Sequence, residues 1–140
     1  MLNPGGPTHW SYFNLADQVI VSERAYKDFL APHTEIDKYD YLNYVPSPHG
    51  MKVHLPKTTR TATAAKMGVM IHGFAAGRTR AERVLETEKI VRDLVAVKKL
   101  GGIFLTDLEI EKGDVYAGWS STWEEFVGIV VAANHGALMN

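Results

Sequence analysis

The chain of 140 residues contains no cysteine. This absence excludes a disulfide framework and thiolate metal sites, and it fits a reducing compartment. No apolar run approaches the roughly 20 residues that span a bilayer, and the first residues lack the basic and apolar segments of a signal peptide. We therefore expect a cytoplasmic protein that makes no membrane contact.

The chain also has little net charge. A formal charge of −1 produces no overall field that would attract nucleic acid, so no specific nucleic-acid partner is expected. With 46% hydrophobic and 22% charged residues, the composition is that of one folded globular domain. The proline and glycine residues between Pro4 and Pro7 predict a flexible N-terminal arm over residues 1–13, followed by a single α/β domain over residues 14–140.

The first half of the chain predicts one helix and three strands. Asn14 is a suitable cap for a helix whose apolar stripe ends before Pro32. Alternating apolar residues between Ile36 and Pro56 predict two short strands around a turn at residues 46–50. The clearest strand spans residues 63–74, where apolar side chains fall on both faces.

The second half predicts a long helix followed by two strands. Thr79 and Glu82 form a capping box, which opens a helix that ends near Leu100. A strand follows at residues 103–111. Residues 125–133 fit either a helix or a strand, and their many β-branched side chains favour the strand. The predicted fold class is therefore α+β, with a mostly antiparallel β-sheet on which one long helix and one N-terminal helix pack.

A glycine-bounded turn, Gly73 to Gly77, joins the predicted strand to the long helix and is followed by Arg78 and Arg80. Free backbone N–H groups at such a helix start can hold an anion. The turn lacks the signatures of a phosphate loop and of a dinucleotide site, so we favour an ordinary strand-to-helix turn.

Other candidate chemistry is sparse. The six histidines lack the paired spacing of a zinc helix, and no cofactor, metal or catalytic residue is predicted. Asp107, Glu109 and Glu111 alternate along the predicted strand, either as paired carboxylates or as its solvated side. Trp119 and Trp123, beside Tyr116, either stack on a ligand or pack against the core or a neighbouring subunit.

The charges are segregated along the sequence, with basic residues in the middle and acidic residues near the end. A nearly neutral subunit with separate patches can pack head-to-tail, although the patches can also meet inside one subunit. The first interpretation predicts a homo-oligomeric ring. The predicted subunit or partner interface comprises Arg60, Lys66, Arg78, Arg80, Asp107, Glu109, Glu111, Trp119 and Trp123.

The order of elements between Thr61 and Asn134 resembles that of the tail-terminator (tail-completion) proteins of long-tailed bacteriophages. The resemblance comprises the strand at residues 63–72, the long helix from Thr79, the strand at residues 103–111 and the segment at residues 114–121 that leads into an apolar element. It implies a structural, non-enzymatic subunit of a ring, usually hexameric, that caps the tail tube and joins it to the head connector. The protein would then assemble in the host cytoplasm and reside in the virion.

Two other functions stay open. The chain is alternatively a small dimeric α/β-barrel enzyme or ligand-binding domain, with His54, His72 and Asp107 lining a pocket. A third interpretation makes it an accessory subunit of a larger enzyme, anchored by Trp119 and Trp123.

Overall fold

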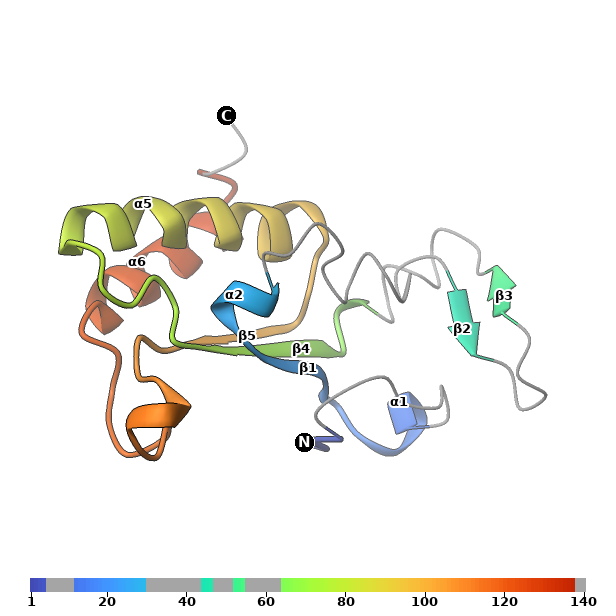
Figure 1. The fold of residues 1–140 in the computed structure, drawn as a ribbon. Coiled ribbons are helices and arrows are strands. Elements are labelled where there is room, and N and C mark those ends of the chain that lie inside the picture. Colours follow the sequence, from blue (N-terminus) through green and yellow to red (C-terminus); the bar gives the residue numbers. More distant parts are fainter. Residues whose placement is uncertain (5–11, 30–43, 47–51, 55–63, 138–140) are drawn as a thin grey trace.

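A computed structural model describes residues 1–4, 12–29, 44–46, 52–54 and 64–137. Three strands, β1 (Val19–Ala25), β4 (Met67–His72) and β5 (Gly102–Leu105), form one sheet in the order β1-β4-β5. Both pairings are parallel. The helices α2 (Tyr26–Phe29), α5 (Arg80–Val91) and α6 (Trp123–Asn134) all lie on one face of this sheet (Figure 1).

The prediction of a mostly antiparallel sheet was therefore wrong. A long helix that returns the chain to the start of the next strand makes parallel neighbours, and α5 does this between β4 and β5. The antiparallel pairing in the described residues is that of β2 (Tyr44–Pro46) with β3 (Lys52–His54) in a separate two-stranded sheet. These strands confirm the two short strands predicted between Ile36 and Pro56. Pro46, predicted in the turn, belongs to β2, and the rest of the predicted turn lies outside the described residues.

The predicted N-terminal helix was also wrong. Its centre is β1, between the short helices α1 (Tyr12–Leu15) and α2. Residues Val19 to Ser22 are all buried. A parallel strand that is buried on both faces of its sheet carries consecutive apolar side chains, and such a run can be mistaken for the apolar stripe of a helix. Leu2 pairs with the outer edge of β1: its amide donates to the Gln18 carbonyl at 2.9 Å, and its carbonyl accepts from Ile20 at 2.8 Å.

The long helix was predicted correctly at its start. The Thr79 side chain accepts a hydrogen bond from the Glu82 amide, and the Glu82 carboxylate accepts one from the Thr79 amide, so the capping box is present. The helix continues as a π-helical segment, η1 (Arg92–Val97), rather than as α-helix to Leu100. Its buried side differs from the predicted stripe, because Leu85 is 57% exposed while Thr87, Ile90, Val91 and Leu94 are buried.

Two further elements differ from the sequence prediction. The strand predicted over residues 103–111 ends at Leu105, and a loop with the 3-10 helix η2 (Ile110–Lys112) follows. Residues 125–133, predicted as a strand, belong to α6. The helix buries Phe126, Ile129 and Ala133, a spacing of three and four residues that places them on one face against the core.

The core lies between the sheet and the helices on its covered face. It combines alternate residues of β4, namely Met67, Val69 and Ile71, with Leu94 and Phe126 from the helical layer. No helix in the described ranges is long and apolar enough to cross a membrane. The predicted arm at residues 1–13 and single domain at residues 14–140 remain predictions, since residues 5–11 lie outside the described part.

Candidate functional site

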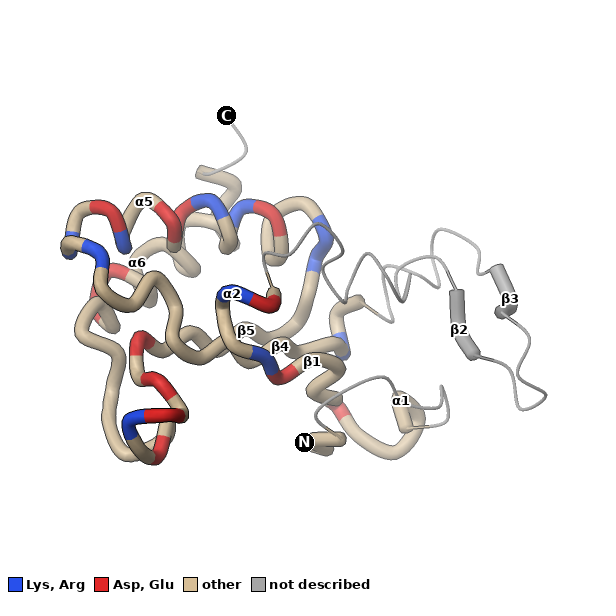
Figure 2. Tube along the Cα trace, in the orientation of Figure 1, with Lys and Arg blue, Asp and Glu red and all other residues tan. Residues whose placement is uncertain are grey.

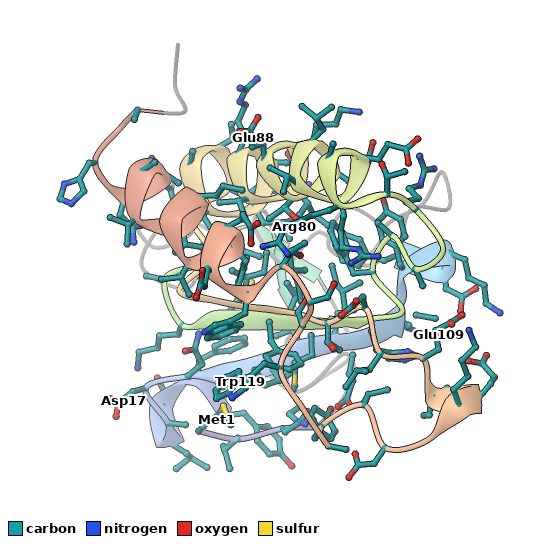
Figure 3. The ribbon with its side chains drawn as sticks, turned by 90° about the vertical axis from the view of Figure 1, so that its left-hand side faces the viewer. Met1, Asp17, Arg80, Glu88, Glu109 and Trp119 are labelled. Atoms are coloured by element: carbon teal, nitrogen blue, oxygen red, sulfur yellow. The ribbon has the colours of Figure 1, made fainter. Side chains whose placement is uncertain are left out.

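Because β1, β4 and β5 are parallel, their carboxyl ends lie along one edge of the sheet. Ligand sites in folds with parallel strands commonly occur at this edge, on the loops that follow the strands. Here the edge carries His72 and the polar loop that begins after Leu105. Figure 3 looks onto this edge, with Arg80 between the helices and the strands, Glu109 to the right and Trp119 on the opposite side of the strands from Arg80.

A cleft of about 490 Å³ opens at the end of β5. We call it the carboxyl-end cleft. Most of its wall comes from the loop after β5, with contributions from the turn before α5 and from the first turns of α5 itself. Its lining residues are Ala76, Gly77, Arg83, Asp107, Leu108, Glu109, Lys112, Gly113, Asp114, Ala117 and Gly118.

Arg83 and Asp107 form the ionic centre of this cleft. The Arg83 Nη1 and Asp107 Oδ2 atoms lie 3.1 Å apart, and the two side chains are only 12% and 17% exposed. The Ser121 amide and hydroxyl donate to the two Asp107 oxygens at 3.0 and 2.7 Å. Burial, the largest single influence, raises the pKa of Asp107, but the Ser121 hydrogen bonds and the Arg83 charge together hold it below its usual value. Asp107 is therefore an ionised, oriented acceptor at neutral pH.

A second ion pair joins α5 to α6 beside this centre. Arg80 Nε donates to Glu125 Oε1 at 2.7 Å, and a backbone hydrogen bond followed by the Arg80 bond lowers the pKa of Glu125. Two buried atoms nearby, Arg83 Nε and Glu125 Oε2, make no hydrogen bond within the described part of the chain. Within the described part, this edge therefore has one hydrogen-bond donor and one acceptor without a partner beside its ion pairs.

A smaller cleft of about 230 Å³ lies at the ends of β1 and β4. It contains His72 and is lined in part by Lys27 and Glu111, whose Nζ and Oε1 atoms are 4.0 Å apart. Glu109 lines both clefts and pairs with Lys112. The two clefts therefore meet at Glu109.

An exposed aromatic surface follows directly after the cleft residue Gly118. Trp119 is 72% exposed, and its ring centroid is 4.5 Å from that of Trp123. Trp123 in turn contacts Phe126 at 5.5 Å and packs against the core. One indole thus supports another, which keeps an apolar face available to solvent one residue beyond Gly118 of the cleft lining.

The turn from Gly73 to Gly77 is hydrogen-bonded to the loop that forms the cleft wall. The Gly73 amide donates to the Leu108 carbonyl at 2.7 Å, and the Phe74 amide donates to the Thr106 carbonyl at 2.8 Å. Gly73 and Gly77 have φ angles of 61° and 77°, which glycine adopts without strain. Because Glu82 already occupies the helix start, these contacts favour the ordinary turn that we preferred from the sequence.

The predicted interface residues are spread over several environments. Lys66 Nζ donates to the Phe13 carbonyl at 2.7 Å, the Arg78 carbonyl accepts from Arg83, and Arg60 lies outside the described residues. Acidic and basic residues also alternate along α5 and around η2 (Figure 2). Opposite charges meet inside one chain in the pairs Arg80–Glu125 and Arg83–Asp107. This is the arrangement that the sequence left open as the alternative to head-to-tail packing.

The predicted pocket of His54, His72 and Asp107 is not assembled by the described residues. His72 lines the smaller cleft and Asp107 the larger one, while the side chain of His54 lies outside the described part. In that part, no group of three or more histidine and acidic residues is placed to hold a metal ion. Sequence reasoning missed Arg83 and Ser121 as site residues, although Arg83, four residues after the capping Thr79, necessarily lies at this end of the helix.

The sequence profile of the spherulation-specific family 4, Spherulin4, matches residues 1–130. The chain belongs to this family. Among curated proteins, no sequence match was found. Among solved structures, by contrast, a match was found.

One such structure is the crystal structure of Aspergillus clavatus Sph3 in complex with GalNAc. It matches with a TM-score of 0.61 and 23% sequence identity, over 91% of this chain and 40% of the Sph3 chain. At this identity the likeness concerns the fold. The chain described here spans less than half of the length of Sph3.

These findings overturn the bacteriophage hypothesis. The chain belongs to the Spherulin4 family and shares the fold of Sph3, so the resemblance to tail-terminator proteins was wrong. The structural ring, the tail-tube and head-connector partners and the virion location, which that resemblance implied, are given up with it. The resemblance failed because it relied on an order of elements in which residues 103–111 and 125–133 were strands. One of these segments is mostly loop and the other is helix.

Proposed function

We propose that this chain binds a carbohydrate containing an N-acetylhexosamine at the carboxyl-end cleft. The observation that carries the proposal is the partly buried Arg83–Asp107 ion pair at the end of β5, together with Ser121, which donates to Asp107. Sph3 shares this fold and was solved with GalNAc. The cleft combines charged acceptors and donors with an adjacent indole face. Carbohydrates require both, because a sugar ring has hydroxyl groups at its rim and C–H groups on its faces.

The chemistry of each part is distinct. The ionised Asp107 carboxylate accepts hydrogen bonds from sugar hydroxyls, and a charge-assisted bond of this kind is stronger than a neutral one. The Trp119 indole offers a flat apolar surface to the C–H face of a ring, and Trp123 holds that indole in place. Arg83 supplies guanidinium N–H donors for carbonyl oxygens such as that of an acetamido group.

Calorimetric titration of the chain with GalNAc, and with galactose as the ligand that lacks the acetamido group, tests this proposal. We expect GalNAc to bind more tightly, and the Asp107→Asn variant to bind it about tenfold more weakly because a charged acceptor is lost. Glu88→Gln is the matched control, since Glu88 lies on the outer side of α5, away from the cleft (Figure 3). Equal binding by Asp107→Asn and the unaltered chain would contradict the proposal.

A second candidate function is hydrolysis of a glycosidic bond. It is favoured by one observation: Asp107 and Glu109 both line the carboxyl-end cleft, and glycoside hydrolysis needs two carboxyl groups that flank the bond. Release of reducing ends from a GalNAc-containing polysaccharide measures it. We expect Asp107→Asn and Glu109→Gln each to lower the rate by roughly 100-fold or more. Binding without any release of reducing ends would leave carbohydrate binding as the function.

A further inference from the structure

Tyr116 connects the loop after β5 to the distant strand β1. Its hydroxyl donates to Glu23 Oε1, across 93 residues of sequence, and its ring lies 6.0 Å from that of Phe104 in β5. The other oxygen of Glu23, Oε2, accepts from Asn3 at 3.0 Å. Glu23 is therefore held from two sides, and the tyrosine bonds to an oriented acceptor.

The segment that carries Tyr116 also builds the proposed site. Asp114, Ala117 and Gly118 line the carboxyl-end cleft, and Trp119 follows them. The far end of the segment is fixed where Ser121 bonds to Asp107. At its near end, Asp114 Oδ1 accepts from the Tyr116 amide at 2.9 Å, which closes a local turn. Between these points, the contact with Glu23 ties the segment to the opposite edge of the sheet.

We propose that the hydrogen bond from Tyr116 to Glu23 positions residues 113–121, so that Gly118 and Trp119 form a fixed wall of the carbohydrate site. This inference rests on the proposed function. Tyr116 is a positioning residue, because its hydroxyl lies in a separate crevice with Glu23, Met70 and Phe104 and is not part of the cleft lining. Holding the wall before the ligand arrives lowers the ordering cost of binding.

The protonation state of Tyr116 is consistent with this role. Burial, followed by the hydrogen bond to Glu23, raises the pKa of Tyr116 to about 12. The hydroxyl therefore keeps its proton, and remains a donor, throughout the neutral and mildly alkaline range. Deprotonation of Tyr116 therefore does not break the contact in this pH range.

The test removes the hydroxyl alone. In a Trp10→Phe background, Trp119 and Trp123 are the remaining fluorophores. Tyr116→Phe should weaken GalNAc binding about threefold to tenfold and increase the quenching of this tryptophan fluorescence by acrylamide. Glu23→Ala should do the same, whereas Glu23→Gln, whose amide oxygen still accepts from the tyrosine, should restore most of both properties. Tyr12→Phe in α1, at the other end of the sheet, is the matched control for loss of a tyrosine hydroxyl (Figure 1).

Two readouts separate this inference from the proposed function. If the unaltered chain binds neither sugar, the proposed function fails, and the quenching of Trp119 and Trp123 still decides whether Tyr116 positions the segment. If Tyr116→Phe binds GalNAc as the unaltered chain does, with the same quenching, the positioning role is wrong. The melting temperature of each variant shows whether it is folded. A general effect of losing a tyrosine hydroxyl would change Tyr12→Phe and Tyr116→Phe alike.

Discussion

The helix-covered face of the sheet and the loops at its carboxyl edge are built in opposite ways. Under the helices, residues such as Val19, Met67 and Leu94 are at most 1% exposed and contact other apolar side chains. At the edge, Arg83 and Asp107 form a partly buried ion pair, and Trp119 is exposed. Burial in the first region removes apolar surface from water, whereas burial in the second orients charges. Stability and ligand recognition should therefore respond to different substitutions.

The largest effect on stability is expected in the core. Leu94→Ala should lower the free energy of unfolding by about 3 kcal/mol, because it leaves a cavity at a residue that is 1% exposed. Leu85→Ala makes the same change at a residue that is 57% exposed, and should cost less than about 0.5 kcal/mol. Urea unfolding measures both. Equal costs would show that the helical layer does not pack as described.

An intermediate effect is expected at the edge, and it should depend on pH. The pKa of Asp107 is lower in the folded chain than its unfolded value of about 3.9, so the folded state gains stability above about pH 4. This gain is lost as the pH falls through the folded-state pKa. Asp107→Asn should therefore lower stability at pH 7 and flatten its decline in acid. Parallel pH profiles for the variant and the unaltered chain would argue against this account of Asp107.

The smallest effects compare two glycines at which an added methyl group would meet only open space. Gly128 lies inside α6, so Gly128→Ala should stabilise the chain by about 0.5–1 kcal/mol. Gly77 has a φ of 77°, so Gly77→Ala should destabilise it by about 1 kcal/mol. Thermal melting compares the two. The same sign for both would mean that backbone conformation does not decide the cost.

Local signals predicted part of the fold. The capping box at Thr79 and Glu82 located the start of α5, and the apolar run before Gly73 indicated β4, because these patterns depend on few neighbours. In contrast, β1 and α6 were assigned to the wrong class. Each is rich in Val and Ile, and such residues fit a doubly buried parallel strand or a helix against the core equally well. For β1, the pairing with β4 decides between strand and helix.

The candidate site could be predicted only in some of its residues, and not in its geometry. Asp107 and Glu109 were interpreted either as paired carboxylates or as the solvated side of a strand, yet both belong to a loop that follows β5. Their meeting with Arg83 and Ser121 depends on where α5 and α6 begin relative to that loop. Long-range packing sets this relation, and residue spacing does not contain it.

The two margins of the parallel sheet are unlike each other. Along β1, the backbone groups of Gln18 and Ile20 are already engaged by Leu2, whereas β5 forms the other margin within the described chain. A strand added at the start of β1 would have to displace Leu2, whereas one added past β5 would displace no strand of the described residues. A strand added there in the same direction would deliver its own following loop beside Asp107, so enlarging the sheet would also enlarge the rim that surrounds the cleft.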